Sequence, residues 1–191
     1  MLSCLLPMPK NQHNALIGTW RFDGGTEFIN DAFKNMLADN GILSETSVSY
    51  MHQQNGHAER LNHMIMDKAQ AMCFHACLMD TMWEYSWNHS IHVYNHTLIK
   101  CLKWQTPFKA LRAEKPDVFH LRIFSCRAYV FLPEDIRINK LSPKSELMVY
   151  LDQPASYKGF CFYRLTNERI FIGITAVFDE TLFPCCPDGK Q

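Results

Sequence analysis

The sequence has no apolar run that approaches the length of a bilayer span, and no basic leader precedes its apolar N-terminus. These absences argue against a membrane-spanning helix and a secretory signal. Internal repeats and low-complexity tracts are also lacking, which argues against a solenoid or a disordered region. Net charge is zero, because 19 Lys and Arg balance 19 Asp and Glu. A strongly basic, free-standing nucleic-acid binder is therefore not expected, although a local basic face remains compatible with this balance.

What the sequence does contain is enough material for a core. It has 191 residues, 47% of them apolar, with 13 Phe, 7 Tyr and 4 Trp. That length suits one medium domain or two small ones. Eight cysteines without a secretory signal indicate free thiols in a reducing, intracellular compartment.

The first half of the chain alternates strand and helix signals. Residues 17–22 predict a short buried strand, and residues 28–37 carry a helical apolar stripe that Asn40-Gly41 would end. Residues 42–50 predict a short strand and a loop. Asp23 then lies at the C-terminal end of a strand, where functional side chains collect in open α/β sheets.

Two longer helices are predicted next, over about 54–77 and 80–96, and Pro107 opens a short helix over 108–112. Glu59 lies on the first turns of the first long helix, just off its apolar stripe. That stripe comprises Ala58, Leu61, Ile65, Ala69 and Met72. The apolar stripe of the second helix comprises Met82, Trp83, Trp87, Ile91 and Tyr94.

After Pro116 the pattern changes to β-branched and aromatic runs separated by prolines and an Asn-containing turn. These runs predict four or five short strands that close into a small barrel, within 121–132, 146–151, 160–165 and 169–178. The predicted division is 1–100 for the α/β part, 101–117 for a linker with a short helix, 118–182 for the barrel and 183–191 for a tail.

Asp23 and Glu59 stand on separate elements, with 35 residues between them. Two carboxylates so placed suit a Mg²⁺ site, because Mg²⁺ prefers oxygen ligands. A pair of such ions can activate a nucleophile and stabilise a leaving oxygen in phosphoryl transfer. In a chain with 19 acids such a pair also arises by chance, so solvated surface acids are the alternative.

The segments around both acids resemble those of copia-type retrotransposon integrases. Residues 20–28, WRFDGGTEF, resemble the segment around the family's second catalytic Asp. Residues 53–62, QQNGHAERLN, closely resemble the third acidic motif. Further similar segments follow in the same order at 82–84, 106–110, 121–129, 158–160 and 176–180. The resemblance therefore extends over nearly the whole chain.

The resemblance implies the later part of an RNase H-like catalytic core, up to about residue 100, followed by an SH3-like barrel after about 118. Asp23 and Glu59 would be the second and third acids of a D,D,E triad that binds two Mg²⁺ or Mn²⁺ ions. The implied chemistry is DNA 3′-end processing by water and strand transfer into target DNA. The implied partners are transposon ends, target DNA and further copies of the chain, and no membrane is implied. The implied place of action is the nucleus.

One departure from the family pattern limits this expectation. Residues 1–22 contain neither Asp nor Glu, so no acid within this sequence precedes Asp23 as the first of the triad. The family's N-terminal zinc-binding module is not found either. We therefore expect the chain as it stands to be catalytically inactive.

Two other hypotheses remain open. The chain could be a non-enzymatic module that binds nucleic acid or a protein partner, or a decayed transposon relic. Arg60, His63 and Lys68 are the candidates for nucleic-acid contacts, with solvated surface charge as the alternative.

Histidines and cysteines raise the question of a second metal site. Cys73 and Cys77 could bind a metal as an i, i+4 pair, but two ligands close no structural site, so packing is favoured. His89, His92 and His96 share one helical face. A partly buried, hydrogen-bonded face is the interpretation we adopt for them.

Overall fold

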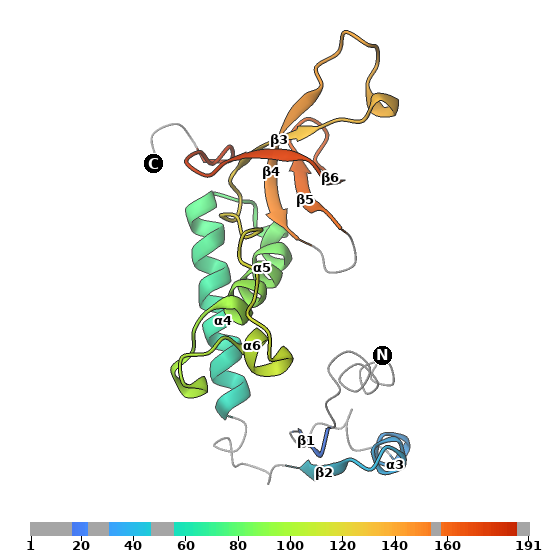
Figure 1. The fold of residues 1–191 in the computed structure, drawn as a ribbon, viewed down its shortest axis with the longest axis vertical. Coiled ribbons are helices and arrows are strands. Elements are labelled where there is room, and N and C mark those ends of the chain that lie inside the picture. Colours follow the sequence, from blue (N-terminus) through green and yellow to red (C-terminus); the bar gives the residue numbers. More distant parts are fainter. Residues whose placement is uncertain (1–16, 23–30, 47–55, 154–157, 187–191) are drawn as a thin grey trace. The chain divides into compact units, whose positions relative to one another are not determined.

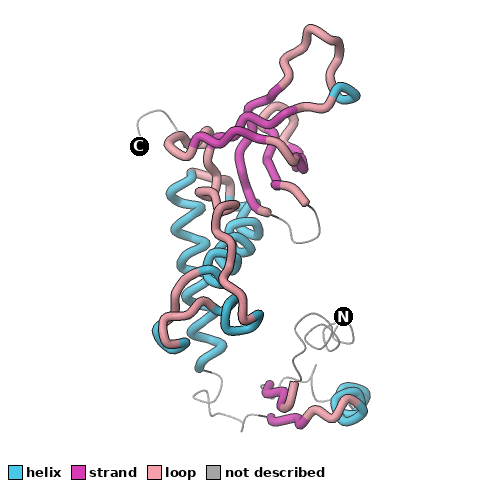
Figure 2. Tube along the Cα trace, in the orientation of Figure 1, coloured by secondary structure: helices cyan, strands magenta, loops and turns pink. Residues whose placement is uncertain are grey.

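The computed structural model describes residues 17–22, 31–46, 56–153 and 158–186 (Figures 1 and 2). The chain divides into two compact units by packing. The N-terminal unit comprises 1–63 with 111–113, and the C-terminal unit comprises 64–110 with 114–191. Helix α4, Gly56–Ala76, runs across the boundary between them. The division predicted at residues 100 and 118 stays a prediction.

In the described part of the N-terminal unit, a strand is followed by a helix and a second strand. These are β1 (Thr19–Phe22), α3 (Asp31–Asp39) and β2 (Leu43–Thr46). The two strands pair in parallel, with Thr19 opposite Leu43 and Phe22 opposite Thr46. A parallel pair needs a crossover connection, and α3 lies within it. The predicted alternation of strand and helix is confirmed for this unit.

Helix α3 ends where the Asn-Gly pair predicted. Gly41 adopts φ +67°, a left-handed conformation that favours glycine. The Ile42 amide donates to the Leu37 carbonyl at 2.9 Å and the Gly41 amide donates to the Ala38 carbonyl at 2.9 Å. This pair of bonds is a Schellman motif, and the side chains of Ile42 and Leu37 are both buried in the unit's core.

That core is small. Among the residues that the structure describes, its buried apolar side chains are Phe22, Phe33, Leu37 and Ile42. The rings of Phe22 and Phe33 meet edge to face, with their centroids 5.7 Å apart. The amphipathic stripe of α3 therefore packs on the strand that leads to Asp23.

The helices of the C-terminal unit follow the predicted order. After α4 come η2 (Asp80–Met82), α5 (Trp83–His96), η3 (Lys100–Leu102) and α6 (Pro107–Arg112). Thr106 caps α6, since its Oγ1 accepts a bond from the Lys109 amide at 3.1 Å. Pro107 occupies the first helical position, where its missing N–H costs nothing.

The predicted buried face of α4 is correct only for its C-terminal half. Ile65 and Ala69 are buried, and Met72 is partly buried. Ala58 and Leu61 are exposed, contrary to the prediction. The apolar stripe of α4 therefore continues in sequence beyond the part of the helix that is buried.

Helix α5 buries a different face from the one predicted. Its buried side chains are Ser86, His89 and Ser90, whereas Trp83 is 54% exposed. The Ser86 hydroxyl donates to the Trp83 carbonyl at 2.7 Å and accepts from the Cys73 thiol at 3.1 Å. The Ser90 hydroxyl donates to the Met72 Sδ at 3.6 Å, so both serines meet side chains of α4.

The remaining strands form one antiparallel sheet. They are β3 (Arg127–Phe131), β4 (Ser145–Asp152), β5 (Phe160–Arg164), β6 (Arg169–Gly173) and β7 (Ala176–Asp179), with η4 (Glu134–Ile136) between β3 and β4. Their order across the sheet is β6-β5-β4-β3-β7. Residues 121–126, predicted as part of a strand, instead form turns, with Ser125 at φ +63°.

The run predicted as one strand over 169–178 is also divided. Strands β6 and β7 lie at opposite edges of the sheet, although only Ile174 and Thr175 join them. Three Cα–Cα steps span at most about 11 Å. A flat sheet of five strands would place its edges about 19 Å apart. The sheet must therefore curl until its edges approach, which gives the predicted barrel.

The curled sheet and the helices of this unit share their hydrophobic packing. One cluster lies between the helices and the sheet and includes Ala76, Phe124 and Leu151. A second lies within the sheet and includes Val130 and Phe162. Helix α5 packs on β4, which agrees with the position of the first cluster. Figure 1 shows the two elements next to each other.

Two further predictions concern thiols and membranes. Every cysteine in the described part of the chain is a free thiol, as predicted. Within that part, no helix combines the length and apolar character that crossing a bilayer requires.

Candidate functional site

Glu59 occupies the first turn of α4, and its side chain is exposed. A carboxylate there suits the positive end of the helix dipole and offers oxygen ligands to a cation from solvent. Among the described residues, no set of three metal-binding side chains includes Glu59. A Mg²⁺ ion there would need further ligands from water, from phosphate or from other residues.

Asp23, the second predicted metal ligand, lies outside the described residues. Its position in the chain is still informative, because β1 ends at Phe22, directly before it. The predicted placement of Asp23 after a parallel strand agrees with the observed strand end. The distance between the carboxylates of Asp23 and Glu59 is not described, so their pairing stays a prediction.

Arg60 and His63 extend the exposed surface beside Glu59. The Arg60 Nε donates to the Gly56 carbonyl at 2.8 Å, which holds the guanidinium along the first turn of α4. Residues three apart are neighbours on a helix, so Arg60 and His63 share one side of α4. A phosphate contact at this end of α4 is therefore sterically open.

Lys68 has a different setting from Arg60 and His63. It is partly buried, and its Nζ lies 5.5 Å from the centre of the Tyr94 ring. Together with Arg122 it also lines a cavity of about 470 Å³ in the C-terminal unit. The Arg122 Nε lies 3.8 Å from the Glu180 Oε1, so one of these two cations already has an acidic partner.

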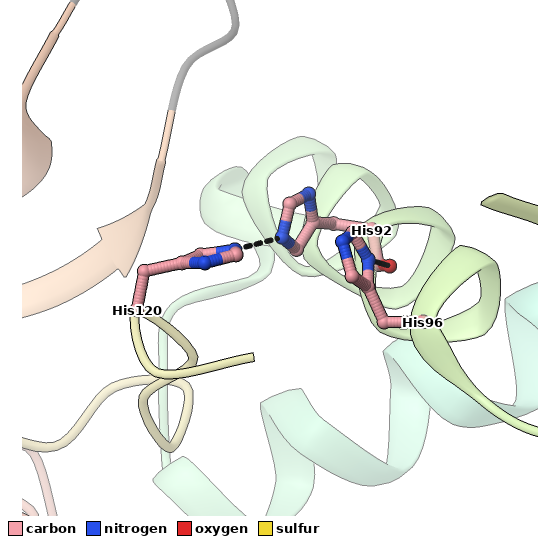
Figure 3. Close-up of side chains that lie close together, drawn as sticks. All are labelled: His92, His96 and His120. Atoms are coloured by element: carbon pink, nitrogen blue, oxygen red, sulfur yellow. Dashed lines mark hydrogen bonds between the residues drawn. The ribbon is translucent and has the colours of Figure 1, made fainter. Parts of the chain in front are cut away.

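The most concentrated set of functional side chains is a cluster that we call the histidine triad: His92, His96 and His120 (Figure 3). The first two come from successive turns of α5, and His120 comes from the loop before β3. One ring nitrogen from each residue lies within 4.8 Å of the others. Sequence analysis found the helical pair but missed His120, because nothing in the local pattern shows that this loop returns to α5.

Hydrogen bonds order the triad. The Nε2 atoms of His92 and His120 lie 2.9 Å apart, and the His96 Nδ1 lies 2.7 Å from the His92 carbonyl oxygen. Both contacts are visible in Figure 3. The prediction of a partly buried, hydrogen-bonded histidine face is confirmed for His92 and His96.

The surroundings of His92 and His120 favour neutral rings. Burial, followed by the neighbouring rings of His96 and His120, lowers the pKa of His92 to about 4, although Asp152 opposes the shift. Burial and His96 also lower the pKa of His120. Both rings are therefore neutral at neutral pH, the form in which imidazole binds metals.

His89 lies on the same helix but outside the triad. Its ring is buried, and its Nδ1 has no hydrogen-bond partner among the described residues. The nearest acid is Asp152, whose Oδ1 lies 3.8 Å from that nitrogen. Asp152 and His92 also line a cavity of about 430 Å³. A polar pocket thus adjoins the triad on one side.

The buried thiols do not compete as metal ligands. Burial raises the pKa of the Cys126 thiol to about 12 and that of the Cys161 thiol to about 11. Neither thiol belongs to a group of three or more metal-binding side chains in the described part of the chain. Cys73 donates to the Ser86 hydroxyl, which agrees with the predicted packing role.

Comparisons with known proteins show that the chain is similar to proteins of retroelements. Residues 126–191 match the family described as "Retroviral polymerase SH3-like domain". The chain is 26% identical over 175 residues to the "Retrovirus-related Pol polyprotein from transposon RE2" of Arabidopsis thaliana, a match that covers 92% of this chain. The resemblance to copia-type retrotransposon proteins is confirmed.

A second copia-type relative is the "Retrovirus-related Pol polyprotein from transposon TNT 1-94" of Nicotiana tabacum, 26% identical over 161 residues and 84% of this chain. The chain spans only 12% of the length of each polyprotein. The SH3-like match covers β3 to β7, so the predicted SH3-like fold of the C-terminal sheet is also confirmed.

A solved structure provides a more distant likeness. It is the cryo-EM structure of the simian T-cell lymphotropic virus intasome in complex with PP2A regulatory subunit B56 gamma. The match covers 90% of this chain and 60% of the matched chain in that structure. The sequence identity is 14% and the TM-score is 0.45.

Proposed function

We propose that this chain is part of a retrotransposon integrase that binds DNA and contributes two acids, Asp23 and Glu59, to metal-dependent DNA integration. The observation that carries the proposal is the homology to copia-type polyproteins over nearly the whole chain. Glu59 supports it, because its motif opens α4 and its carboxylate is exposed at the first helical turn.

Each residue has a definable task in this proposal. Asp23 and Glu59 supply carboxylate oxygens, the ligands that Mg²⁺ and Mn²⁺ prefer. When bound, two such ions would activate the attacking oxygen and stabilise the leaving oxygen in phosphoryl transfer. Arg60 and His63, exposed beside Glu59, would hold a DNA phosphate and so position the strand without reading its sequence.

A polypeptide of these 191 residues is proposed to be inactive alone. It supplies only two acids of the proposed catalytic triad, Asp23 and Glu59, where the chemistry needs three. The test is a strand-transfer assay with Mg²⁺ or Mn²⁺. It compares the 191-residue chain with a fusion to the segment that precedes the matched region in the tobacco polyprotein. We expect product from the fusion only, and we expect Glu59→Gln to abolish it, whereas the matched surface change Glu45→Gln leaves it intact.

Two outcomes would contradict this proposal in different ways. Product from the isolated chain that disappears in Glu59→Gln would overturn its inactivity while keeping the role of Glu59. Product from the fusion that survives Glu59→Gln would remove Glu59 from the chemistry. Sedimentation of the chain with and without a DNA end would show whether DNA assembles further copies, as the proposed integrase role requires.

A second candidate function is nucleic-acid binding without catalysis. Lys68 and Arg122 favour it, because they line one cavity in the C-terminal unit. Binding to duplex DNA that falls with salt and survives Glu59→Gln would support this function. Lys68→Gln should weaken the binding. It should also reduce the slope of log K against log salt concentration by about one. Unchanged binding and slope in Lys68→Gln would exclude this cavity.

A further inference from the structure

The histidine triad offers ligands of a different chemistry from the proposed carboxylate site. Imidazole nitrogens favour zinc and its neighbours in the first transition row, whereas Mg²⁺ favours oxygen. Three converging imidazoles from a helix and a loop therefore suit a zinc-like ion rather than the Mg²⁺ or Mn²⁺ of the proposed strand transfer. None of the three residues belongs to the acidic motifs, so an inference about them stands independently of the proposed function.

We propose that His92, His96 and His120 bind one Zn²⁺ ion through their Nε2 atoms, with water in the fourth position. Zinc takes four ligands in a tetrahedral arrangement, and sites with three protein ligands leave one position to solvent. Within the described residues, the triad is the only group of three or more metal-binding side chains with this proximity.

The hydrogen bond of His96 fixes the correct ring nitrogen for this role. Its Nδ1 lies 2.7 Å from the His92 carbonyl oxygen, and a carbonyl oxygen only accepts. The proton must therefore reside on Nδ1, and the neutral ring keeps its lone pair on Nε2. Metal-binding histidines characteristically use their second nitrogen in this way, which orients the ring.

His92 and His120 already point their Nε2 atoms at each other, 2.9 Å apart (Figure 3). Without a metal, one neutral ring donates and the other accepts in this contact. Two nitrogens bound to the same tetrahedral zinc at about 2.05 Å would be about 3.3 Å apart. The rings need to separate by about 0.4 Å, a small side-chain adjustment because His120 lies on a loop.

The spacing within α5 supports the same geometry. His92 and His96 are separated by one helical turn, and their ring centroids lie 4.4 Å apart. Two histidines at i and i+4 on one helix face can bind a single zinc ion. His120 then supplies the third ligand from a different segment, with its ring centroid 5.2 Å from that of His92.

Zinc bound here would connect α5 to the segment that enters β3. Residues 117–122 lie between α6 and the first strand of the SH3-like sheet, and they form no helix or strand but a turn at 119–120. A metal bond from His120 would fasten this segment to the helix. Because folding creates the site, binding should raise the thermal stability of the C-terminal unit.

The test is calorimetric titration of the metal-free, full-length chain with Zn²⁺, with thermal melting in parallel. We expect a stoichiometry of one and a higher Tm with zinc. His96→Gln and His120→Gln should each weaken the binding at least about 100-fold, since even loss of an outer partner costs up to that factor. Melting of each variant without zinc establishes that it is folded.

His75→Gln is the matched control, because it removes one imidazole from α4 of the same unit and leaves the triad intact. The Cys186 thiol donates to the His75 backbone carbonyl at 3.3 Å, so a site that combines the His75 imidazole with a thiol is the rival to exclude. Cobalt distinguishes the two: nitrogen ligation gives visible d–d bands without a thiolate charge-transfer band. Zinc binding lost only in His75→Gln, a thiolate band, or no binding by the unaltered chain would each overturn the proposal.

Discussion

In the N-terminal unit, two parallel strands share one helix and a core of four buried apolar side chains in the described part of the chain. In the C-terminal unit, five antiparallel strands curl into a barrel, and two buried clusters fill the barrel and its junction with the helices. Among the described residues, the N-terminal unit thus has the smaller core. Its strands gain less stability from local burial than the strands of the SH3-like sheet.

The largest expected effect tests this difference in cores directly. Phe162 is fully buried in the sheet cluster, so Phe162→Ala should lower the free energy of unfolding of the C-terminal unit by about 3–5 kcal/mol. Phe33→Ala removes the same atoms from the N-terminal core. Hydrogen exchange should show faster exchange of β3–β5 in the first variant and of β1–β2 in the second. Equal acceleration of both regions in either variant would show that the units unfold together.

A second substitution tests how tightly the barrel closes. A Cβ added at Gly173 would lie 2.8 Å from the Val130 Cγ1 and 3.3 Å from the Phe171 Cε1. Gly173→Ala should therefore lower the free energy of unfolding by about 1–3 kcal/mol through overpacking. Gly18→Ala in the N-terminal unit is the control, since nothing lies within 4 Å of its added Cβ. A fully stable Gly173→Ala chain would mean that β3 and β6 can move apart without cost.

Both units also contain the same ion pair in different surroundings. Arg21 with Glu45 and Arg164 with Glu146 each have Nη2 to Oε2 distances of 2.7 Å. The first pair is at least half exposed, whereas the side chains of the second are 20% and 21% exposed. Glu146 also accepts from the Thr166 hydroxyl at 2.9 Å.

Chemical denaturation of two variants separates burial from pairing. Glu146→Gln should lower the free energy of unfolding by about 1–2 kcal/mol, because the partly desolvated charge of Arg164 loses its partner. Glu45→Gln should cost less than about 1 kcal/mol, the usual range for an exposed pair. High salt should reduce the second loss more than the first. Equal losses at both sites would indicate that solvent reaches the Arg164 pair as freely as the Arg21 pair.

Local signals predicted much of this fold. The strand before Asp23, the stop at Asn40-Gly41, the proline that opens α6 and most strands of the barrel depend on residues close in sequence. The position of Glu59 at the start of α4 was predicted for the same reason. Residues within one turn of each other carry the information for caps, turns and strand ends.

Long-range packing decided what the sequence did not predict. Helix α5 buries Ser86 and Ser90 because Cys73 and Met72 of α4 lie against them. The strand predicted over 169–178 breaks because its two halves reach opposite edges of a curled sheet. His120 joins the triad because its loop returns to α5. Each outcome depends on contacts between segments that are distant in sequence, which periodicity does not report.

The smallest effect concerns the backbone of the N-terminal unit. Gly41 adopts φ +67°, with nothing within 4 Å of an added Cβ, so a substitution there meets conformational strain rather than a clash. Gly41→Ala should cost about 1 kcal/mol, whereas Gly41→Asn should cost less, because asparagine tolerates the left-handed region better. Thermal melting followed by exchange at the β2 amides would measure the difference. Equal losses for Ala and Asn would mean that the left-handed conformation of residue 41 does not set the cost of the substitution.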